Sequence, residues 1–447
     1  MPDLASMEQP ASAPLVGIGF GPAGIALSAA MTDDALHGVP GADPRAAAES
    51  VFFERADDSA WQPGMVLPGT DIQHHFLRDF GTPRYPGSHF GFVRFLQDAD
   101  RFYPFTLRGG YVSRAEWSAY CQWAAQRTES QVAYGHEVIS VEPVHADGLL
   151  QAVRVHARDW RSGAVRQVET TRLVLGTGHE PYVPEEFVPL LGERVFHSTA
   201  FSQRWPQLAG EVRSALVLGG GQNAGEILLH LYHATDLELF SVVRNSGFRL
   251  YDLGHFANQA YWPAETDYFH RLPAAARGQI FDEQYRTNYA AVDPDVSTGL
   301  YNAWYDGEVS GNQRLHMIKR HQIVEAELAG PGVRVVVQDR YTGETRELNP
   351  DVVVLSTGFR EQPVPRVLDP LREHLTVEED GKLAATRDYR TPLRAAGDVA
   401  VYLNGMTESR HGIATATSFS LLALRAGEIA HSLRTNTRTR ENAGALS

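Results

Sequence analysis

The 447-residue sequence contains a single cysteine, Cys121. One cysteine excludes an internal disulfide, a CxxC redox pair and a thiolate zinc site, and it suits a reducing cytoplasm. No run approaches about eighteen consecutive apolar residues, so no membrane span is expected. Basic residues are outnumbered, because 40 lysines and arginines face 54 aspartates and glutamates. The resulting net charge of −14 argues against nucleic acid as a partner.

The beginning of the chain lacks the features of a targeting signal. The stretch MPDLASMEQPASAP has no basic region followed by an apolar core, so residues 1–13 are predicted to form a disordered tail. A composition of 43% hydrophobic and 21% charged residues is that of a soluble globular protein. A chain of this length exceeds one ordinary core, so two or three domains are expected.

A glycine-rich turn follows the first apolar run, Leu15–Ile18. The turn is GFGPAG, and helical sequence comes after it. A strand, glycine turn and helix bring backbone N–H groups up to a pyrophosphate, and a Cβ atom in the turn would block that approach. The predicted cofactor contacts of this turn are Gly19, Gly21, Pro22 and Gly24. The next predicted strand, SVFFE, ends in Glu54, whose carboxylate is placed to bind an adenosine ribose hydroxyl.

A second glycine-rich turn, GGGQNA, follows the apolar run SALVL. Its predicted cofactor contacts are Gly219, Gly221, Gln222 and Asn223. The next predicted strand ends in Arg244 rather than in an acid. An arginine there accommodates a 2′-phosphate, which favours NADPH over NADH, although a solvated arginine is the alternative.

Two further segments, RLVLGTGHEPYVP and DVVVLSTGFREQP, each place a hydrophobic strand before Thr-Gly. Such strands are typical of the places where the chain crosses between the domains of flavoproteins, and Thr357 and Gly358 are predicted cofactor contacts. The sequence therefore predicts an α/β flavoprotein with two dinucleotide-binding domains. A Rossmann-like FAD domain (14–205 and 331–447) is expected to carry an inserted Rossmann-like NADPH domain (206–330).

Several separated motifs resemble those of the flavin-dependent N-hydroxylating monooxygenases, the ornithine and lysine hydroxylases of siderophore synthesis. The resemblance extends from Leu15 to Leu433. Its motifs, in chain order, are WQPGM, IQHHFLRDFGTPRYPGSHFGFVRFL, GGGQNAGE, FANQAYWPAETDYFHRLP, TNYAAVD, LSTGF and HGIATATSFSLLALRAGEI.

The resemblance implies the chemistry and the site. NADPH would reduce FAD, O2 would form a C4a-hydroperoxyflavin, and its distal oxygen would pass to a neutral amine. Gln73 and Trp61 would lie near the flavin, and Asn258 would reach the substrate and the nicotinamide ribose. Asn288 and Ser420 would contact the substrate, although Asn288 could cap a turn and Ser420 could bond to its own helix. No metal is implied, and relatives are commonly dimers or tetramers.

The segment Asp71–Gly87 departs from the family at Arg78, where relatives have a lysine that grips the substrate carboxylate. A planar guanidinium binds a carboxylate with two hydrogen bonds, whereas an ammonium is a point charge. Arg286 and Arg410 are further unusual cations. If the three arginines converge, a compact dicarboxylate suits the site, so the sequence favours L-aspartate, oxidised through N-hydroxyaspartate to nitrosuccinate in natural-product biosynthesis.

Other interpretations remain open. Ornithine or lysine hydroxylation for siderophores is the main alternative, and a non-catalytic flavin-binding redox sensor is the alternative of another class. A Baeyer–Villiger oxygenase is disfavoured, because its fingerprint is only loosely matched around His197. A metal site at His74 and His75 is disfavoured too, since adjacent side chains on a strand face opposite ways.

Overall fold

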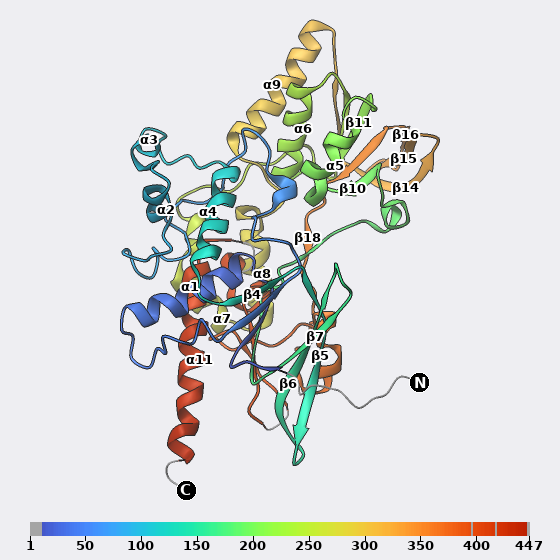
Figure 1. The fold of residues 1–447 in the computed structure, drawn as a ribbon. Helices are drawn as coiled ribbons and strands as arrows, with labels where there is room; N and C mark the ends of the chain where they lie inside the picture. Colours follow the sequence, from blue (N-terminus) through green and yellow to red (C-terminus); the bar gives the residue numbers. More distant parts are fainter. Residues whose placement is uncertain (1–10, 395–396, 416–417, 445–447) are drawn as a thin grey trace.

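The computed structural model describes residues 11–394, 397–415 and 418–444. It shows an α/β protein with two separate parallel sheets, each accompanied by helices (Figure 1). The predicted fold class is confirmed. Of the predicted tail, residues 1–10 lie outside the described residues. Ala11–Ser12 form strand β1 and pair in parallel with β7 (Val165–Thr170), so the prediction of disorder was wrong there.

The first parallel sheet is assembled from both ends of the chain. Its spatial order is β19 (Arg390–Thr391), β20 (Ala400–Leu403), β8 (Arg172–Leu175), β2 (Val16–Ile18), β3 (Val51–Glu54) and β4 (Gln131–Tyr134). All neighbours pair in parallel except β19, which lies antiparallel to β20 at the edge. This sheet is the one that carries the first glycine turn, between β2 and helix α1 (Pro22–Leu36).

The second sheet is entirely parallel and carries the second glycine turn. Its order is β10 (Val195–His197), β17 (Val352–Leu355), β11 (Ser214–Leu218), β12 (Glu238–Val243) and β13 (Leu315–Lys319). Strands β10 and β17 lie outside the predicted range 206–330 for the inserted domain. The prediction was too narrow, because both strands pair with this sheet and not with the first.

Three smaller sheets complete the β-structure. In one of them the strands lie in the order β1, β7, β6 (Leu149–Asp159) and β5 (His136–Ala146). In another the order is β14 (His321–Ala329), β15 (Gly332–Asp339) and β16 (Thr345–Leu348). The third pairs β9 (Glu180–Pro181) with β18 (Phe359–Arg360) in antiparallel fashion. These two short strands come from the two segments predicted to cross between the domains, so the outgoing and returning connections lie side by side.

The helices are placed as follows. Besides α1, the α-helices are α2 (Phe92–Asp98), α3 (Phe102–Thr106), α4 (Arg114–Arg127), α5 (Phe201–Leu208), α6 (Gln222–Ala234), α7 (Pro263–Arg271), α8 (Ala274–Gln284), α9 (Pro294–Ser310), α10 (Glu408–His411) and α11 (Leu422–Gly444). Short 3-10 helices are η1 (Pro63–Met65), η2 (Glu185–Leu190), η3 (Ser198–Ala200), η4 (Ala257–Tyr261), η5 (Tyr285–Thr287), η6 (Arg366–His374) and η7 (Ile413–Thr415). None of the helices in the described ranges is long and apolar enough to cross a membrane.

Local sequence explains where the important helices begin. Ser113 caps α4 by accepting a hydrogen bond from the N–H of Glu116 at 3.2 Å. Helix α1 begins with Pro22, which needs no hydrogen-bond partner for its nitrogen in the first turn. Helices α1 and α6 both have glycine at the cap, Gly21 and Gly221, which leaves their N-terminal N–H groups uncovered by a side chain.

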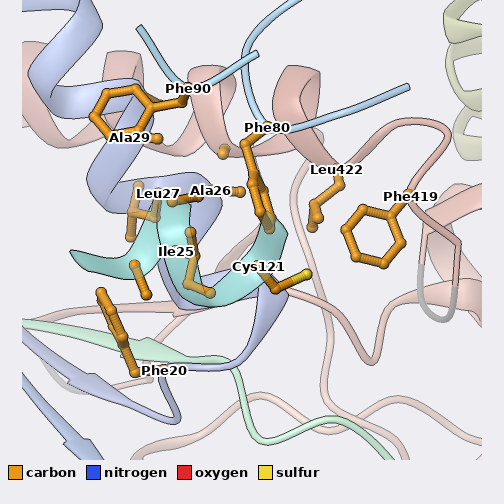
Figure 2. Close-up of a cluster of buried hydrophobic side chains, with 14 of the residues drawn as sticks. Phe20, Ile25, Ala26, Leu27, Ala29, Phe80, Phe90, Cys121, Phe419 and Leu422 are labelled. Carbon is orange, nitrogen blue, oxygen red and sulfur yellow. The ribbon is translucent and has the colours of Figure 1, made fainter. Parts of the chain in front are cut away.

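The core of the first domain connects distant parts of the chain. Side chains of α1 pack with Cys121 of α4 and with Phe80, Phe419 and Leu422 (Figure 2). Cys121 is fully buried, and burial raises the pKa of its thiol. It is a small apolar core residue in this setting. Because Phe80 and Phe419 share this core, the segments on either side of them are held in fixed positions beside the first sheet.

The need for glycine in the second turn can be tested by adding a side chain at Gly219. A Cβ atom on Gly219 would lie 2.1 Å from the carbonyl oxygen of Ser356, and the φ of Gly219 is +142°. We expect Gly219→Ala to lower the free energy of unfolding by about 3 kcal/mol, because both the contact and the backbone angle are unfavourable. The measurement is chemical denaturation. Gly220→Ala is the matched control, because its Cβ would lie 3.5 Å from Val243, an ordinary contact. Equal stabilities of the two variants would contradict the prediction.

Candidate active site

The first glycine turn passes close to a neighbouring strand and leaves the N-terminus of α1 open. A Cβ on Gly19 would lie 2.6 Å from the carbonyl oxygen of Gly176, so the turn crosses the end of β8 closely. A Cβ on Gly21 would meet nothing within 4 Å, so the helix N-terminus faces open space. The Glu54 carboxylate at the end of β3 accepts hydrogen bonds from the N–H groups of Phe20 (2.6 Å) and Ala56 (2.8 Å). The turn and the acid therefore stand together, as a dinucleotide requires.

The second turn repeats this arrangement beside β17. Gly219 crosses Ser356 as described, and the nearest atom to a Cβ on Gly221 is 4.0 Å away. Close by, the Nδ2 atom of Asn223 is buried without a hydrogen-bond partner among the described residues. A buried N–H donor at a helix N-terminus fits a phosphate oxygen. Arg244 is exposed directly after β12.

The segment that follows η1 is held in place by a buried carboxylate. Asp79 accepts hydrogen bonds from the N–H groups of Gly81 (2.9 Å), Thr82 (2.6 Å) and Phe92 (2.7 Å). Burial raises the pKa of Asp79, and these hydrogen bonds oppose that rise. A loop whose N–H groups converge on one carboxylate has a fixed shape, so the direction of the preceding side chain, Arg78, is fixed as well.

Arg78 and Ser420, both predicted to contact substrate, lie against each other. The Nη1 of Arg78 donates to Oγ of Ser420 at 2.7 Å, although the two residues are far apart in sequence. The Arg78 guanidinium also lies over the ring of Tyr261, 5.8 Å from its centre. Burial lowers the pKa of Arg78, and arginine stays charged in proteins. The site therefore presents a half-buried guanidinium with hydrogen-bond donors to spare.

Tyr261, Asn288 and Glu408 form the adjoining side of the site. The Oη of Tyr261 lies 2.8 Å from the Thr287 carbonyl and 3.2 Å from Oδ1 of Asn288. Glu408 accepts a hydrogen bond from the hydroxyl of Tyr289. Burial raises the pKa of Glu408 to about 7. Burial is also the main reason that the pKa of Tyr261 is raised to about 12.

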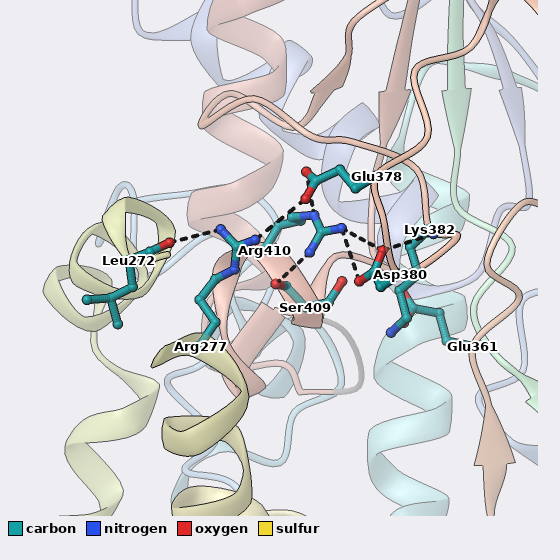
Figure 3. Close-up of polar contacts among 8 residues, drawn as sticks. All are labelled: Leu272, Arg277, Glu361, Glu378, Asp380, Lys382, Ser409 and Arg410. Carbon is teal, nitrogen blue, oxygen red and sulfur yellow. Dashed lines mark hydrogen bonds and ion pairs between the residues drawn. The ribbon is translucent and has the colours of Figure 1, made fainter. Parts of the chain in front are cut away.

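Arg410 corrects the predicted trio of arginines. Arg410 is 3% exposed, and its guanidinium pairs with Glu378 (2.8 Å) and with Asp380 (3.0 and 3.1 Å), as Figure 3 shows. Two carboxylates neutralise this cation, so it adds no free positive charge for a substrate. Arg286 lies exposed on η5. The expected excess of positive charge is therefore not present at Arg410, and the argument for a dicarboxylate substrate loses that support.

Gln73, Gln222 and Asn258 are the residues predicted to lie near the flavin and the nicotinamide. Gln73 is exposed in the segment that leads to Arg78. Gln222 accepts from the N–H of Asp293 at 2.8 Å and donates to Glu226 at 2.9 Å. Asn258 lies on η4, half-buried, and its Nδ2 donates to the Gly254 carbonyl at 3.2 Å.

The remaining predicted residues lie at the edges of the site. Trp61 packs edge-on against Phe419, with ring centres 5.8 Å apart. Thr357 donates to the Tyr182 carbonyl, and the Gly358 carbonyl accepts from the Tyr182 N–H at 2.9 Å, so both belong to the crossing between the domains.

The paired histidines of the segment are not equivalent. The ring of His74 stacks on Phe419, with centres 4.9 Å apart, and meets Trp117 edge-on at 4.7 Å. Burial lowers the pKa of His74 to about 3, so this ring is neutral and belongs to the aromatic core. His75 is exposed and stacks on Phe76. Their side chains therefore have different surroundings.

Sequence reasoning missed Tyr261, Glu408 and Asp293. Tyr261 and Asp293 fall within motifs quoted for the family resemblance, FANQAYWPAETDYFHRLP and TNYAAVD, so position alone could have drawn attention to them. Glu408 gives no such signal, because its burial and its contact with Tyr289 arise from the tertiary fold.

The two glycine turns, each at the end of a parallel sheet and facing open space, define a protein with two dinucleotide-binding domains. The sequence model of the family L-lysine 6-monooxygenase/L-ornithine 5-monooxygenase matches residues 11–361. The chain belongs to this family. It is a flavin-dependent N-hydroxylating monooxygenase that uses FAD and NADPH.

The similar proteins cover almost the whole chain. The L-ornithine N(5)-monooxygenase of Pseudomonas aeruginosa is 32% identical, with 94% of this chain and 93% of the relative covered. Among solved structures, an ornithine N-hydroxylase of Kutzneria sp. 744 with reduced FAD, NADP+ and L-ornithine has a TM-score of 0.88 and 31% identity, covering 95% of this chain and 100% of that one. The L-lysine 6-monooxygenase of Pseudomonas syringae has a TM-score of 0.85 and 38% identity, covering 95% and 99%.

The buried carboxyl group of Glu408 should make the stability of the protein depend on pH. Its pKa in the folded protein is about 7, above the ordinary value of 4.5. Between these pH values the folded chain holds a proton that the unfolded chain has released, so stability falls as the pH rises through this window. The loss is a few kcal/mol, since each pKa unit is worth about 1.4 kcal/mol. We expect Glu408→Gln to flatten this decline, measured as melting temperatures at pH 5 and pH 8.

Glu185→Gln is the control for this measurement, because Glu185 is an exposed glutamate on η2. It should show the same decline as the unmodified protein. An unchanged decline in Glu408→Gln would show that the carboxyl group titrates normally.

Proposed function

We propose that the protein hydroxylates the side-chain amine of a basic amino acid of the ornithine or lysine type. The observation that supports this most is the guanidinium of Arg78, which lies over the ring of Tyr261 and is anchored by the neutral hydroxyl of Ser420. Such a cation complements the carboxylate of an amino acid, and the names of the relatives point to ornithine and lysine.

Arg78 is proposed to bind the substrate carboxylate. Its guanidinium is anchored by Ser420 through one nitrogen, which leaves other N–H groups for a carboxylate. Asn288 and Asn258 are proposed to contact the rest of the substrate, and Asn258 also the nicotinamide ribose. Aspartate, which the sequence alone favoured, is disfavoured here, because Arg410 is paired with Glu378 and Asp380 and the relatives are named for ornithine and lysine.

The cofactors are proposed to bind at the two glycine turns. Gly19, Gly21, Pro22 and Gly24 would hold the FAD pyrophosphate, and Glu54 its ribose. For NADPH, the contacts would be Gly219, Gly221, Gln222, Asn223 and Arg244. Trp61, Gln73, Thr357 and Gly358 would line the space between the two domains. The bound flavin supplies the chemistry with O2, while these residues orient it and exclude water.

A substrate panel tests the proposal. The protein, saturated with FAD, is given NADPH and either ornithine, lysine, aspartate or putrescine, and hydroxylamine product and hydrogen peroxide are both measured. We expect product with ornithine or lysine. Product with aspartate alone would overturn the proposed substrate class. NADPH consumption that yields no hydroxylated product with any amine would overturn the proposed function, and absence of NADPH consumption would favour a redox sensor.

The role of Arg78 predicts a graded series. Arg78→Ala should raise the KM for the amino acid about 10- to 100-fold, because hydrogen bonds to charged groups contribute about 1.5–3 kcal/mol. Arg78→Lys keeps the charge but not the planar fork, so its KM should lie between the two. Steady-state hydroxylamine formation gives these values. Reduction of FAD by NADPH without amine is measured alongside, because a loss there would indicate general damage. A KM unchanged in Arg78→Ala would remove Arg78 from the site.

A further inference from the structure

One arginine of the first domain is buried without a counter-ion. Arg425, in the first turn of α11, is 2% exposed, and its Nε donates to Oδ1 of Asn404 at 3.0 Å. Its Nη1 is also buried and has no hydrogen-bond partner among the described residues. None of the carboxylates that the structure describes forms an ion pair with it. Because taking an unpaired charge out of water is costly, this arrangement needs a physical reason.

Asn404 connects this arginine to the first glycine turn. It directly follows β20, and its N–H donates to the carbonyl of Leu175, the last residue of β8, at 2.7 Å. Its Nδ2 donates to the carbonyl of Ala23, in the first turn of α1, at 2.7 Å. Ligands of such sheets bind at the carboxyl ends of the parallel strands. Arg425 is therefore separated by one side chain from the turn at which the FAD diphosphate is proposed to bind.

The dipoles of two helices oppose a cation at this position. The N-terminus of a helix carries partial positive charge, so it attracts anions and repels cations. Arg425 stands in the first turn of its own helix and, through Asn404, against the first turn of α1. Burial lowers the pKa of Arg425 to about 10, although arginine stays charged in proteins. An anion at the N-terminus of α1 would offset each of these costs, and the FAD diphosphate is such an anion.

We propose that Arg425 is the buried counter-charge of the FAD diphosphate, held against the first glycine turn by Asn404. It is a positioning residue for the cofactor, because it acts through its charge and through the Asn404 amide. The carbonyl oxygen of that amide accepts from Arg425, so the amide nitrogen is the end that faces Ala23. This inference rests on the FAD site proposed above.

Two substitutions separate the charge of Arg425 from its hydrogen bond. Arg425→Gln places an amide nitrogen at the position of Nε, so it can still donate to Asn404, but it removes the charge. Arg425→Lys keeps the charge and has a methylene group at that position. Arg410→Gln is the matched control, because it makes the same change at a buried arginine whose charge Glu378 and Asp380 already neutralise.

The main measurement is the dissociation constant of FAD, obtained by titrating the full chain, freed of FAD, with the cofactor. We expect Arg425→Gln to raise this constant about tenfold, because opposite charges attract strongly at the low effective dielectric of a buried site. Arg425→Lys should stay within about threefold of the unmodified protein, since the charge is kept. Arg410→Gln should also leave FAD binding nearly unchanged.

The melting temperature of the FAD-free protein should move in the opposite sense for the two arginines. Arg425→Gln removes an unpaired buried charge, so its melting temperature should equal or exceed that of the unmodified protein. Arg410→Gln leaves two carboxylates without their cation, so its melting temperature should fall.

The reduction potential of bound FAD shows which part of the cofactor the charge acts on. The diphosphate keeps its charge when the flavin is reduced, so Arg425→Gln should weaken oxidised and reduced FAD equally. The potential should therefore shift by less than about 15 mV, which corresponds to about threefold in affinity for a two-electron couple.

An FAD dissociation constant unchanged by Arg425→Gln would overturn the inference, and with a lower melting temperature it would indicate a purely structural role. A potential lowered well beyond the expected limit would place the charge beside the flavin ring and would overturn the inference too. These measurements need neither amine nor turnover, so they are independent of the proposed substrate class. Failure of the unmodified protein to bind FAD would overturn the proposed cofactor site itself, which is distinct from FAD binding that is indifferent to Arg425.

Discussion

The architecture depends on a close approach of backbone to backbone that occurs twice. In each parallel sheet, the first glycine of the turn passes a carbonyl of a neighbouring strand end so closely that a side chain cannot fit: Gly19 passes Gly176, and Gly219 passes Ser356. This approach brings the helix N-terminus to the edge of the sheet and leaves the next glycine facing open space. Both cofactor sites, and the reaction space between them, follow from this one constraint.

The charge that the site can offer a substrate depends on which charged side chains are not already paired within the protein. Arg410 is the more deeply buried of the two arginines, yet Glu378 and Asp380 neutralise it, whereas Arg78 is anchored by a neutral hydroxyl and keeps its charge available. Glu408 is likewise held by a neutral partner, Tyr289. An inventory of charged residues would count all of them equally, but the pKa of Glu408 is raised to about 7 by burial, so Arg78 is the one whose charge stays available, and it favours a substrate with a carboxylate.

The features that could be predicted from the sequence are those that depend on residues close together in the chain. The glycine turns, the apolar strands before them and the acid at the end of β3 follow local rules, so the fold class was predictable. Arg78 and Ser420 were assigned to the substrate site by their motif positions, but their hydrogen bond to each other was not predicted. The boundary of the inserted domain was missed because β10 and β17 join the second sheet from outside its glycine turn. The state of Arg410 was missed because its partners, about thirty residues earlier, lie in an irregular segment without periodicity.

The antiparallel pair β9–β18 has a consequence for how the molecule is assembled. Because Pro181 pairs with Phe359, the chain leaves the first domain and returns to it at almost the same point. The two connections to the inserted domain therefore lie side by side. The inserted domain could therefore be exchanged between related proteins in a chimera. Such a chimera would have to keep the Arg114–Glu226 pair, since this salt bridge joins the inserted domain to the first domain.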